Sequence, residues 1–312
     1  MSHDAPTVIA WVESPLQFIG AAEWAAVHRR RVPIAGRLTD QMSATADELL
    51  ARRAMFGRLE PYIGIPWALL AENRHWLVGD GFSGQFRLAA AVLRPQRITL
   101  LDDGANSIAL ADALLGRRDY ARPGVRERRL TTLAAPFALE RMLRLARAGT
   151  LEMFTAFELG ANRREALQDR GMTVATHRFE WTRASASRGR APEDLTRSGR
   201  VLLGSARPVD GRLDVGVYLA WVTAEASIAP LTYLPHRREP STQLDAVRAI
   251  AGVTVSDAHL PAELLLSGAR RPLEVMTVAS STTTTLPLVL EGTGSVLREW
   301  TPGTELDQRV NR

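Results

Sequence analysis

The stretch Thr7-Val-Ile-Ala-Trp-Val-Glu-Ser-Pro-Leu-Gln17 decides the fold of this chain. Residues 7–12 form a short apolar run rich in β-branched and aromatic side chains, a composition that favours a buried strand. Ser14 then suits the N-cap of a helix, and Pro15 suits its first turn. Apolar residues recur at helical spacing from Leu16 toward Arg30. The stretch therefore predicts a strand followed at once by a helix, which is how a βαβ unit begins.

The same alternation of short apolar runs and helical patterns continues through the first half of the chain. Predicted strands cover residues 32–35, 75–78, 97–101, 153–156 and 173–177, and predicted helices cover residues 40–58, 83–93 and 106–115. The Arg-rich residues 117–147 have no clear assignment. Strands that alternate with helices form a parallel sheet with helices on both faces, so we expect that arrangement here.

A second series follows residues 185–198, whose Ser, Arg, Gly and Pro content is typical of a linker. Its predicted strands cover residues 200–204, 231–233, 252–255 and 273–278, and its predicted helices cover 213–226, 241–250, 261–266 and the residues from 280 on. A chain of 312 residues is long enough for two domains. We therefore predict two Rossmann-like α/β domains, residues 1–190 and 199–312, that face each other across a cleft.

The composition is that of a soluble globular protein, with 46% hydrophobic and 23% charged residues. The formal net charge is +5, and all 39 side chains counted as Lys or Arg are Arg. The basic clusters are scattered and contain few aromatic residues, which argues against a nucleic-acid-binding surface. A mild positive field favours anionic ligands such as nucleotides, acidic sugars or anionic lipid surfaces.

The sequence has no Cys, so disulfides, thiolate nucleophiles and cysteine metal sites are excluded. Residues 1–10 lack the charged start and apolar stretch of a signal peptide. No apolar run reaches the ~18 residues of a membrane-spanning helix. We expect a cytoplasmic protein, and its positive charge is compatible with peripheral contact with the inner face of the membrane.

Two adjacent carboxylates, Asp102 and Asp103, follow the predicted strand 97–101 and precede Gly104. One interpretation is a turn that caps the next helix, because Asp and Gly suit such a bend. The other is catalytic, because a carboxylate at the carboxyl end of a parallel strand faces the edge where ligands bind. There it would remove a proton from an acceptor hydroxyl.

Three stretches in the second half have the same two interpretations. His236 and its neighbouring arginines either belong to a solvated loop or donate to a phosphate. Ser280 and Ser281 either cap a helix or bind phosphate at its N-terminus. Glu263, in Pro261-Ala-Glu263, either supports a helix start or accepts hydrogen bonds from ribose hydroxyls.

Taken together, these stretches resemble bacterial sialyltransferases of the lipooligosaccharide sialyltransferase and polysialyltransferase group. The likeness spans most of the chain, although each motif is short, and the group often has His-Pro where this chain has His236-Arg237. The motifs are Ser14-Pro-Leu-Gln17, Gly79-Asp-Gly-Phe-Ser-Gly-Gln85, Asp102-Asp-Gly104, Leu203-Gly-Ser205, Pro235-His236, Pro261-Ala-Glu263 and Ser280-Ser281.

The resemblance implies a GT-B fold and an inverting glycosyltransferase that moves sialic acid or a related nonulosonic acid from a CMP-activated donor to a glycan or glycolipid acceptor. It implies no metal requirement. It also implies no cofactor, because the CMP-activated sugar is a co-substrate. Asp103 would be the general base and Asp102 its supporting neighbour, while His236 would assist the departing phosphate. The implied substrate-binding residues are Ser14, Gln17, Gly204, His236, Glu263, Ser280, Ser281 and Thr282.

Two alternatives remain open at this point. One is a glycosyltransferase that uses another nucleotide sugar, since short turn motifs do not specify which nucleobase the donor carries. The other is a non-catalytic relative that binds nucleotide sugars, although binding alone would need no base at position 103.

Overall fold

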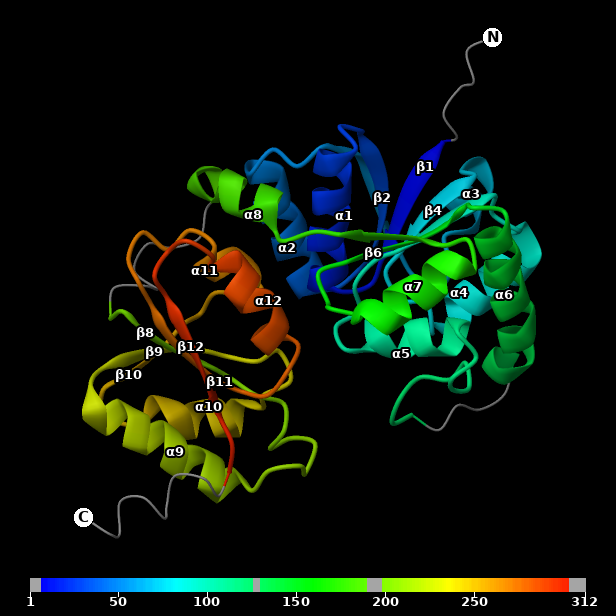
Figure 1. Cartoon of the computed structure of the whole chain (residues 1–312). Helices are drawn as coiled ribbons and strands as arrows, with labels where there is room; N and C mark the ends of the chain where they lie inside the picture. The colour runs from blue at the N-terminus through cyan, green and yellow to red at the C-terminus, as the bar shows by residue number, and fades with distance from the viewer. Residues whose placement is uncertain (1–6, 126–129, 190–197, 303–312) are drawn as a thin grey trace. The chain divides into compact units, whose positions relative to one another are not determined.

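The computed structural model describes residues 7–125, 130–189 and 198–302 (Figure 1). The chain divides into two compact units, Met1–Arg188 and Gly189–Arg312, which are described separately below. Of the predicted linker 185–198, residues 190–197 lie outside the described residues.

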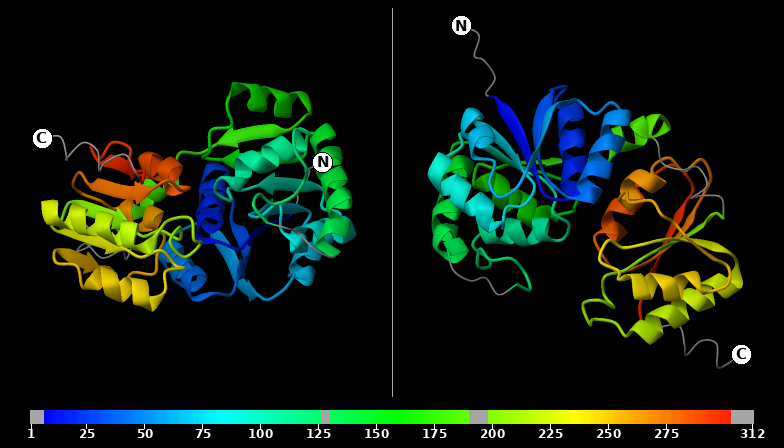
Figure 2. Two further views of the ribbon diagram at one scale, coloured as in Figure 1. Left: turned by 90° about the horizontal axis from the view of Figure 1, so that it is seen from below. Right: turned by 180° about the vertical axis from the view of Figure 1, so that it is seen from behind.

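The first unit is built on a parallel sheet whose seven described strands have the order β3-β2-β1-β4-β5-β6-β7. Helices cover both faces of this sheet (Figures 1 and 2). The strands are β1 (Val8–Val12), β2 (Val32–Arg37), β3 (Phe56–Tyr62), β4 (His75–Val78), β5 (Arg97–Leu100), β6 (Leu151–Thr155) and β7 (Thr173–Thr176). The helices are α1 (Pro15–Val27), α2 (Asp40–Ala51), α3 (Trp67–Glu72), α4 (Gly84–Leu93), α5 (Asn106–Leu114), α6 (Leu130–Arg147), α7 (Ala161–Asp169) and α8 (Glu180–Ser185).

The second unit repeats this plan with a smaller parallel sheet of order β10-β9-β8-β11-β12 in the described residues. Its strands are β8 (Arg200–Leu203), β9 (Leu231–Leu234), β10 (Val253–Val255), β11 (Glu274–Val278) and β12 (Val296–Trp300). Its helices are α9 (Val215–Ile228), α10 (Ser241–Arg248), α11 (Ala262–Leu266) and α12 (Thr282–Val289). The prediction of an α/β protein with two Rossmann-like parallel sheets is thus confirmed.

Apolar strands hold each unit together. All five residues of β1 are buried, and Trp11 packs edge-on against Trp76 of the neighbouring β4, with ring centroids 6.5 Å apart. In the second unit Tyr233 of β9 is buried and its hydroxyl lies 2.8 Å from that of Tyr218 on α9. Strands buried on both faces read as continuous apolar runs, which is why the sequence reveals them.

The sequence misplaced several elements. The helix predicted for residues 40–58 ends at Ala51, because Arg53 adopts a left-handed conformation with φ of 64° and residues 56–62 form the strand β3. This strand lies at the edge of the sheet and is only partly buried, so its apolar pattern is weak. The unassigned residues 117–147 contain α6. The elements α3, α7, α8 and β12 were also not predicted.

The strand order brings specific strand ends together. In the first unit β1, β4 and β5 are neighbours, and in the second β9, β8 and β11 are neighbours. Each set includes the point where the strand order reverses, and ligands of open α/β sheets bind at the carboxyl ends of strands near that point. Except for Glu263 on α11, which follows β10, the predicted site residues lie in the loops that follow these strand ends or in the helices that begin there.

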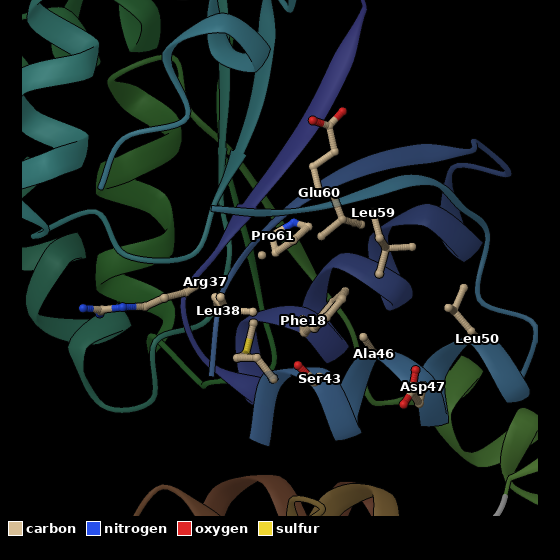
Figure 3. Close-up of a pocket in the computed structure, with 13 residues that line it drawn as sticks. Phe18, Arg37, Leu38, Ser43, Ala46, Asp47, Leu50, Leu59, Glu60 and Pro61 are labelled. Atoms are coloured by element: carbon tan, nitrogen blue, oxygen red, sulfur yellow. The ribbon is translucent and has the colours of Figure 1, made fainter. Parts of the chain in front are cut away.

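One open pocket lies next to this edge in the first unit (Figure 3). It has a volume of about 290 Å³ and lies between α2 and the strands β2 and β3. Among the described residues, no helix combines the length and apolar character needed to cross a lipid bilayer.

Candidate functional site

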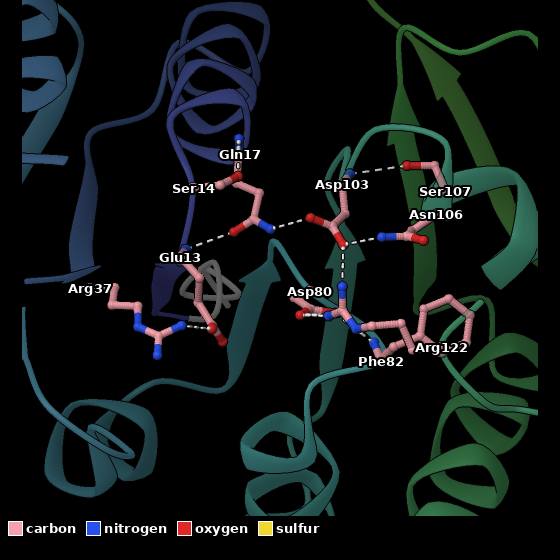
Figure 4. A network of polar contacts seen from close by, with 10 residues as sticks. All are labelled: Glu13, Ser14, Gln17, Arg37, Asp80, Phe82, Asp103, Asn106, Ser107 and Arg122. Carbon is pink, nitrogen blue, oxygen red and sulfur yellow. Dashed lines mark hydrogen bonds and ion pairs between the residues drawn. The ribbon is translucent and has the colours of Figure 1, made fainter. Parts of the chain in front are cut away.

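Three carboxylates converge at the carboxyl edge of the first sheet (Figure 4). Glu13 follows β1, Asp80 follows β4 and Asp103 follows β5. We call these three residues the acidic cluster. Two arginines accompany them: Arg37 lies 3.2 Å from Glu13, and Arg122 pairs closely with Asp80 and lies 3.5 Å from Asp103.

Asp103 is held from both sides by side-chain amides. Gln17 on α1 donates to its Oδ1 at 2.8 Å, and Asn106 on α5 donates to its Oδ2 at 2.9 Å. Gln17 is itself fixed, because its Oε1 accepts the backbone N–H of Glu13 at 2.6 Å. Each carboxylate oxygen has two acceptor positions, so Asp103 keeps capacity for a further donor. Its side chain is 21% exposed, which makes it accessible to a ligand.

Burial and neighbouring negative charge raise the pKa values of the other two acids. Burial raises the pKa of Asp80, and the nearby charge of Asp103 raises it further, while Arg122 opposes both effects. Burial also raises the pKa of Glu13, with Asp80 as the next contribution and Arg37 acting in the opposite direction. Carboxylates with raised pKa values at the functional edge of a sheet are typical of active sites.

Gly79 makes this arrangement possible. A Cβ atom at this position would overlap with the side-chain amide of Gln17, which packs directly over the backbone between β4 and Asp80. Any other residue would displace Gln17 and, with it, one of the two amides that hold Asp103. The close approach explains why the turn after β4 begins with glycine.

Asp102 has a different environment from its neighbour. It is 1% exposed, and its Oδ2 accepts the backbone N–H of Ala156 at 2.7 Å. The Thr155 hydroxyl donates to its Oδ1, and Nε2 of His177 lies 3.2 Å from Oδ2. Ser107 also donates to Asp102, at 3.2 Å, and accepts the backbone N–H of Asp103 at 3.1 Å. The buried Asp102 side chain therefore connects the turn at residues 102–104 to the end of β6.

In the second unit a single carboxylate organises the loops after β8 and β9. Glu239 accepts the backbone N–H groups of Ser205 at 3.2 Å and His236 at 2.8 Å. Its Oε1 also accepts from the Tyr233 hydroxyl at 2.5 Å and from Gln243 at 2.8 Å. Burial raises the pKa of Glu239, and these four donors oppose that effect.

Gly204 allows these two loops to meet. A Cβ atom here would lie 2.5 Å from the backbone nitrogen of His236 and 2.5 Å from Oε2 of Glu239. The backbone nitrogen cannot move aside as a flexible side chain would, so the position requires glycine. Gly204 also donates its own N–H to the carbonyl of Leu234 at 2.7 Å. The two predicted residues Gly204 and His236 are thus in direct contact.

His236 is a neutral imidazole at neutral pH. Burial lowers its pKa to about 4, and the cations Arg237 and Arg238 lower it further, while Asp210 acts in the opposite direction. The backbone N–H of Arg238 points to its Nδ1 at 3.2 Å, so Nδ1 is the acceptor and the proton resides on Nε2. Nε2 is therefore the hydrogen-bond donor that His236 offers to a ligand.

The remaining predicted residues lie where β11 leads into α12 and on α11. Ser280 and Thr282 share a hydrogen bond of 2.7 Å between their hydroxyls, and Ser281 is the N-cap residue of α12. Glu263 on α11 is buried and accepts from the Thr285 hydroxyl of α12 at 2.6 Å. Burial raises its pKa, and the Thr285 contact opposes that effect.

The structure gathers the predicted residues into one group in each unit. Ser14, whose hydroxyl accepts the N–H of Gln17 at 3.5 Å, joins Gln17 and the aspartate pair in the first unit. In the second, Arg207 links the loop after β8 to the end of β11, because it follows Gly204 and Ser205 in that loop and donates to the carbonyl of Ala279 at 2.8 Å.

The sequence did not reveal six residues of these groups, because no local sequence pattern marks any of them as a site residue. Asp80 belongs to the motif Gly79-Asp-Gly-Phe-Ser-Gly-Gln85 but has no role of its own there, and Glu239 follows the arginines after His236 without a motif. Arg122 comes from the unassigned region. The missed residues are Glu13, Asp80, Asn106, Arg122, Arg207 and Glu239.

Within the described residues, no three His, Cys, Asp or Glu side chains are grouped as metal ligands would be.

The fold is similar to known structures at low sequence identity. The co-structure of S. aureus MnaA with UDP aligns with a TM-score of 0.56 and 11% identity, over 98% of this chain and 82% of that one. UDP-glucose: anthocyanidin 3-O-glucosyltransferase in complex with UDP aligns with a TM-score of 0.47 and 10% identity, over 95% and 80% of the two chains. E. coli heptosyltransferase WaaC with ADP-2-deoxy-2-fluoro heptose aligns with a TM-score of 0.41 and 11% identity, over 93% and 87%.

Sequence comparison adds no family assignment. No protein-family model matches the chain, and no curated protein matches it. The similarity to the MnaA structure confirms the fold that the sequence predicted: the chain is an α/β protein with a GT-B-like pair of parallel Rossmann-like sheets.

Proposed function

We propose that this protein is an inverting glycosyltransferase that moves sialic acid or a related nonulosonic acid from a CMP-activated donor to a glycan hydroxyl. The observation that carries the proposal is the setting of Asp103 at the carboxyl end of β5. Gln17 and Asn106 orient its carboxylate, and it remains partly exposed beside two acids of raised pKa. A binding protein has no need of such an oriented base.

On the acceptor side, Asp103 acts as the general base. It takes the proton of the acceptor hydroxyl while that oxygen attacks the anomeric carbon of the donor. The bond from the anomeric carbon to the phosphate oxygen breaks, and its electron pair leaves with CMP. Arg122 limits the build-up of negative charge between Asp80 and Asp103, which keeps the acidic cluster compatible with an anionic donor sugar.

On the donor side, the second unit binds CMP. Nε2–H of His236 donates to the phosphate, and the hydroxyls and backbone N–H groups of Ser280, Ser281 and Thr282 bind it at the start of α12. Arg207 adds positive charge beside Ala279. These groups stabilise the charge that develops on the leaving phosphate, and Gly204 allows the loops after β8 and β9 to meet beside it. Glu263 is buried against Thr285 of α12, so it supports that helix rather than contacting the ribose.

The nucleotide preference tests this proposal directly. We expect CMP to raise the melting temperature more than UDP or GDP does, because the proposed donor groups fit a single phosphate. At about 100 times the dissociation constant, CMP would add roughly 2.7 kcal/mol to the apparent free energy of unfolding. Thermal shift measurements with the three nucleotides, and donor hydrolysis assays with and without chelator, give the comparison. A larger shift with UDP or GDP would instead favour a nucleoside-diphosphate sugar as donor.

A second prediction concerns His236. Its replacement by Ala should lower turnover by about 10²–10³-fold, the typical loss when one donor to a developing anion is removed. His236→Gln retains an N–H donor and should lose less, because the imidazole is already neutral and acts only as a donor. Turnover of both variants against the unmodified protein measures the difference.

The pH dependence supplies the control for His236. Its pKa of about 4 lies below the usual 6.5, so it stays neutral in the folded protein as the pH rises through 6.5. Turnover should therefore show no step near pH 6.5 that depends on this residue. If turnover falls with rising pH there, and His236→Gln abolishes that fall, then His236 acts as an acid rather than as a neutral donor.

A further inference from the structure

A pocket of the first unit lies at the edge of the sheet opposite to the acidic cluster. Its volume is about 380 Å³, within the range of pockets that hold small ligands. It is lined by the first residues of four parallel strands, His75 of β4, Arg97 of β5, Leu151 of β6 and Thr173 of β7. The acidic cluster follows the carboxyl ends of such strands, so this pocket at their amino ends is a separate site.

Two arginines bring positive charge to this pocket. Arg30 follows α1 and Arg97 begins β5, and both line the pocket. The side chain of Arg97 forms no hydrogen bond or ion pair with any described residue, so its guanidinium group is available to a ligand. Glu152 is the one acid among the described residues of the lining. The two guanidinium groups outweigh this carboxylate, and the pocket therefore favours an anionic group.

Glu152 and His75 add hydrogen-bond acceptors to the same pocket. Oε2 of Glu152 accepts from the Thr99 hydroxyl at 2.7 Å and from Nε1 of Trp24 at 3.4 Å. Because the Thr99 hydroxyl gives its one proton to Glu152, it accepts from Nε2–H of His75 at 2.9 Å. The neutral imidazole of His75 then keeps Nδ1 as an acceptor. A ligand that suits these groups carries hydrogen-bond donors as well as negative charge.

The other groups around His75 keep it neutral and limit repulsion of an anion. Burial lowers the pKa of His75 to about 3, and Arg97, Arg30 and His28 act in the same direction. The ring of His28 stacks on Trp24 with centroids 4.0 Å apart, and its Nδ1 donates to the carbonyl of Trp24 at 2.9 Å. This contact satisfies a carbonyl at the negative end of α1, which would otherwise oppose anion binding.

We infer that this pocket binds a small sugar phosphate, whose phosphate contacts Arg30 and Arg97 and whose hydroxyls donate to Glu152 and to Nδ1 of His75. Guanidinium groups bind phosphate through charge-assisted hydrogen bonds. The two acceptors require donors, which sugar hydroxyls supply. The inference goes beyond the proposed function, since none of these residues belongs to the proposed contacts with donor or acceptor.

Binding of glucose 6-phosphate to the full chain tests the pocket. In calorimetric titrations at constant ionic strength, it should bind about ten-fold more tightly than inorganic phosphate, because its hydroxyls add hydrogen bonds. Glucose, which lacks the phosphate, should show no measurable binding. Equal affinities for glucose 6-phosphate and inorganic phosphate would overturn the assignment of a sugar. Absence of glucose 6-phosphate binding would overturn the inference as a whole.

Arg97→Gln and two matched controls locate the binding. Arg97 is exposed, so this variant should fold and should bind glucose 6-phosphate roughly ten- to hundred-fold more weakly, the usual effect of losing one charge-assisted hydrogen bond. Arg144→Gln makes the same change on α6 outside the pocket, and Arg207→Gln makes it in the second unit. Both controls should keep the original affinity. Unchanged affinity in Arg97→Gln, or a comparable loss in Arg207→Gln, would contradict the assignment.

The imidazole resonances give a reading at the pocket that does not depend on activity. In NMR titrations of histidine-labelled protein, glucose 6-phosphate should shift the resonances of His28 and His75, which line the pocket. The variant His28→Gln identifies one of them by its loss. A shift confined to His236 would place the ligand in the second unit and overturn the inference.

Discussion

Replacing Asp103 by Asn is expected to lower the turnover of sugar transfer by about 10²–10⁴-fold, the usual contribution of a general base. Asn has nearly the shape of Asp but does not accept a proton from an acceptor hydroxyl. CMP affinity should change little, because the proposed nucleotide contacts belong to the second unit. Steady-state turnover, CMP titration and melting temperature, measured on one preparation, provide the three readings.

The contacts of Asp103 show what the substitution would leave in place. An Asn side chain still accepts from Gln17 or Asn106 through its one carbonyl oxygen, and its amide group faces the other. We therefore expect a modest loss of stability, on the order of 1 kcal/mol. Near-normal turnover in a folded Asp103→Asn protein would rule out Asp103 as the general base. It would leave Asp103 with a structural role in the turn before α5, whose N-cap residue is Ala105 and has no side-chain cap.

Asp102→Ala is expected to produce the opposite pattern, with a large loss of stability as its direct effect. The side chain accepts from the hydroxyls of Ser107 and Thr155, from the backbone N–H of Ala156 and from the ring of His177, and it is fully enclosed. Leaving several buried donors unpaired, at roughly 1–3 kcal/mol each, should cost about 3–5 kcal/mol. For a unit of this size, the melting temperature would fall by roughly 6–20 °C.

Comparing the turnover of the Asp102 and Asp103 variants shows which of the two aspartates is the general base. At a temperature where both variants are folded, Asp102→Ala should lose less turnover than Asp103→Asn, because Asp102 acts on the turn through Ser107 rather than on the substrate. Thermal melting, together with turnover below the transition, separates stability from chemistry. Greater loss of turnover in a folded Asp102→Ala protein would instead identify Asp102 as the general base.

The predictable part of the fold is local in origin. The apolar run before Ser14, the helix cap at Ser14 and the glycine-containing turns follow from the composition of a few neighbouring residues. These patterns place β1, β4, β5, β8, β9 and β11 close to their observed positions and mark the turns after them. Because parallel strands present their carboxyl ends at one edge, the turns also indicate where a site would form.

The sequence by itself determined two α/β units and the strand-end turns of the candidate site, whereas only the tertiary structure decided how those turns are assembled. The strand order places β4 between β1 and β5, so that Asp80 comes beside Asp103, and Arg122 reaches both from 42 and 19 residues away. Asp102 and Asp103 are adjacent in sequence, yet one is enclosed with His177 and the other meets Gln17 and Asn106. Local propensity is the same for both aspartates. Their difference arises from packing against distant segments, because consecutive residues in an extended chain point to opposite sides.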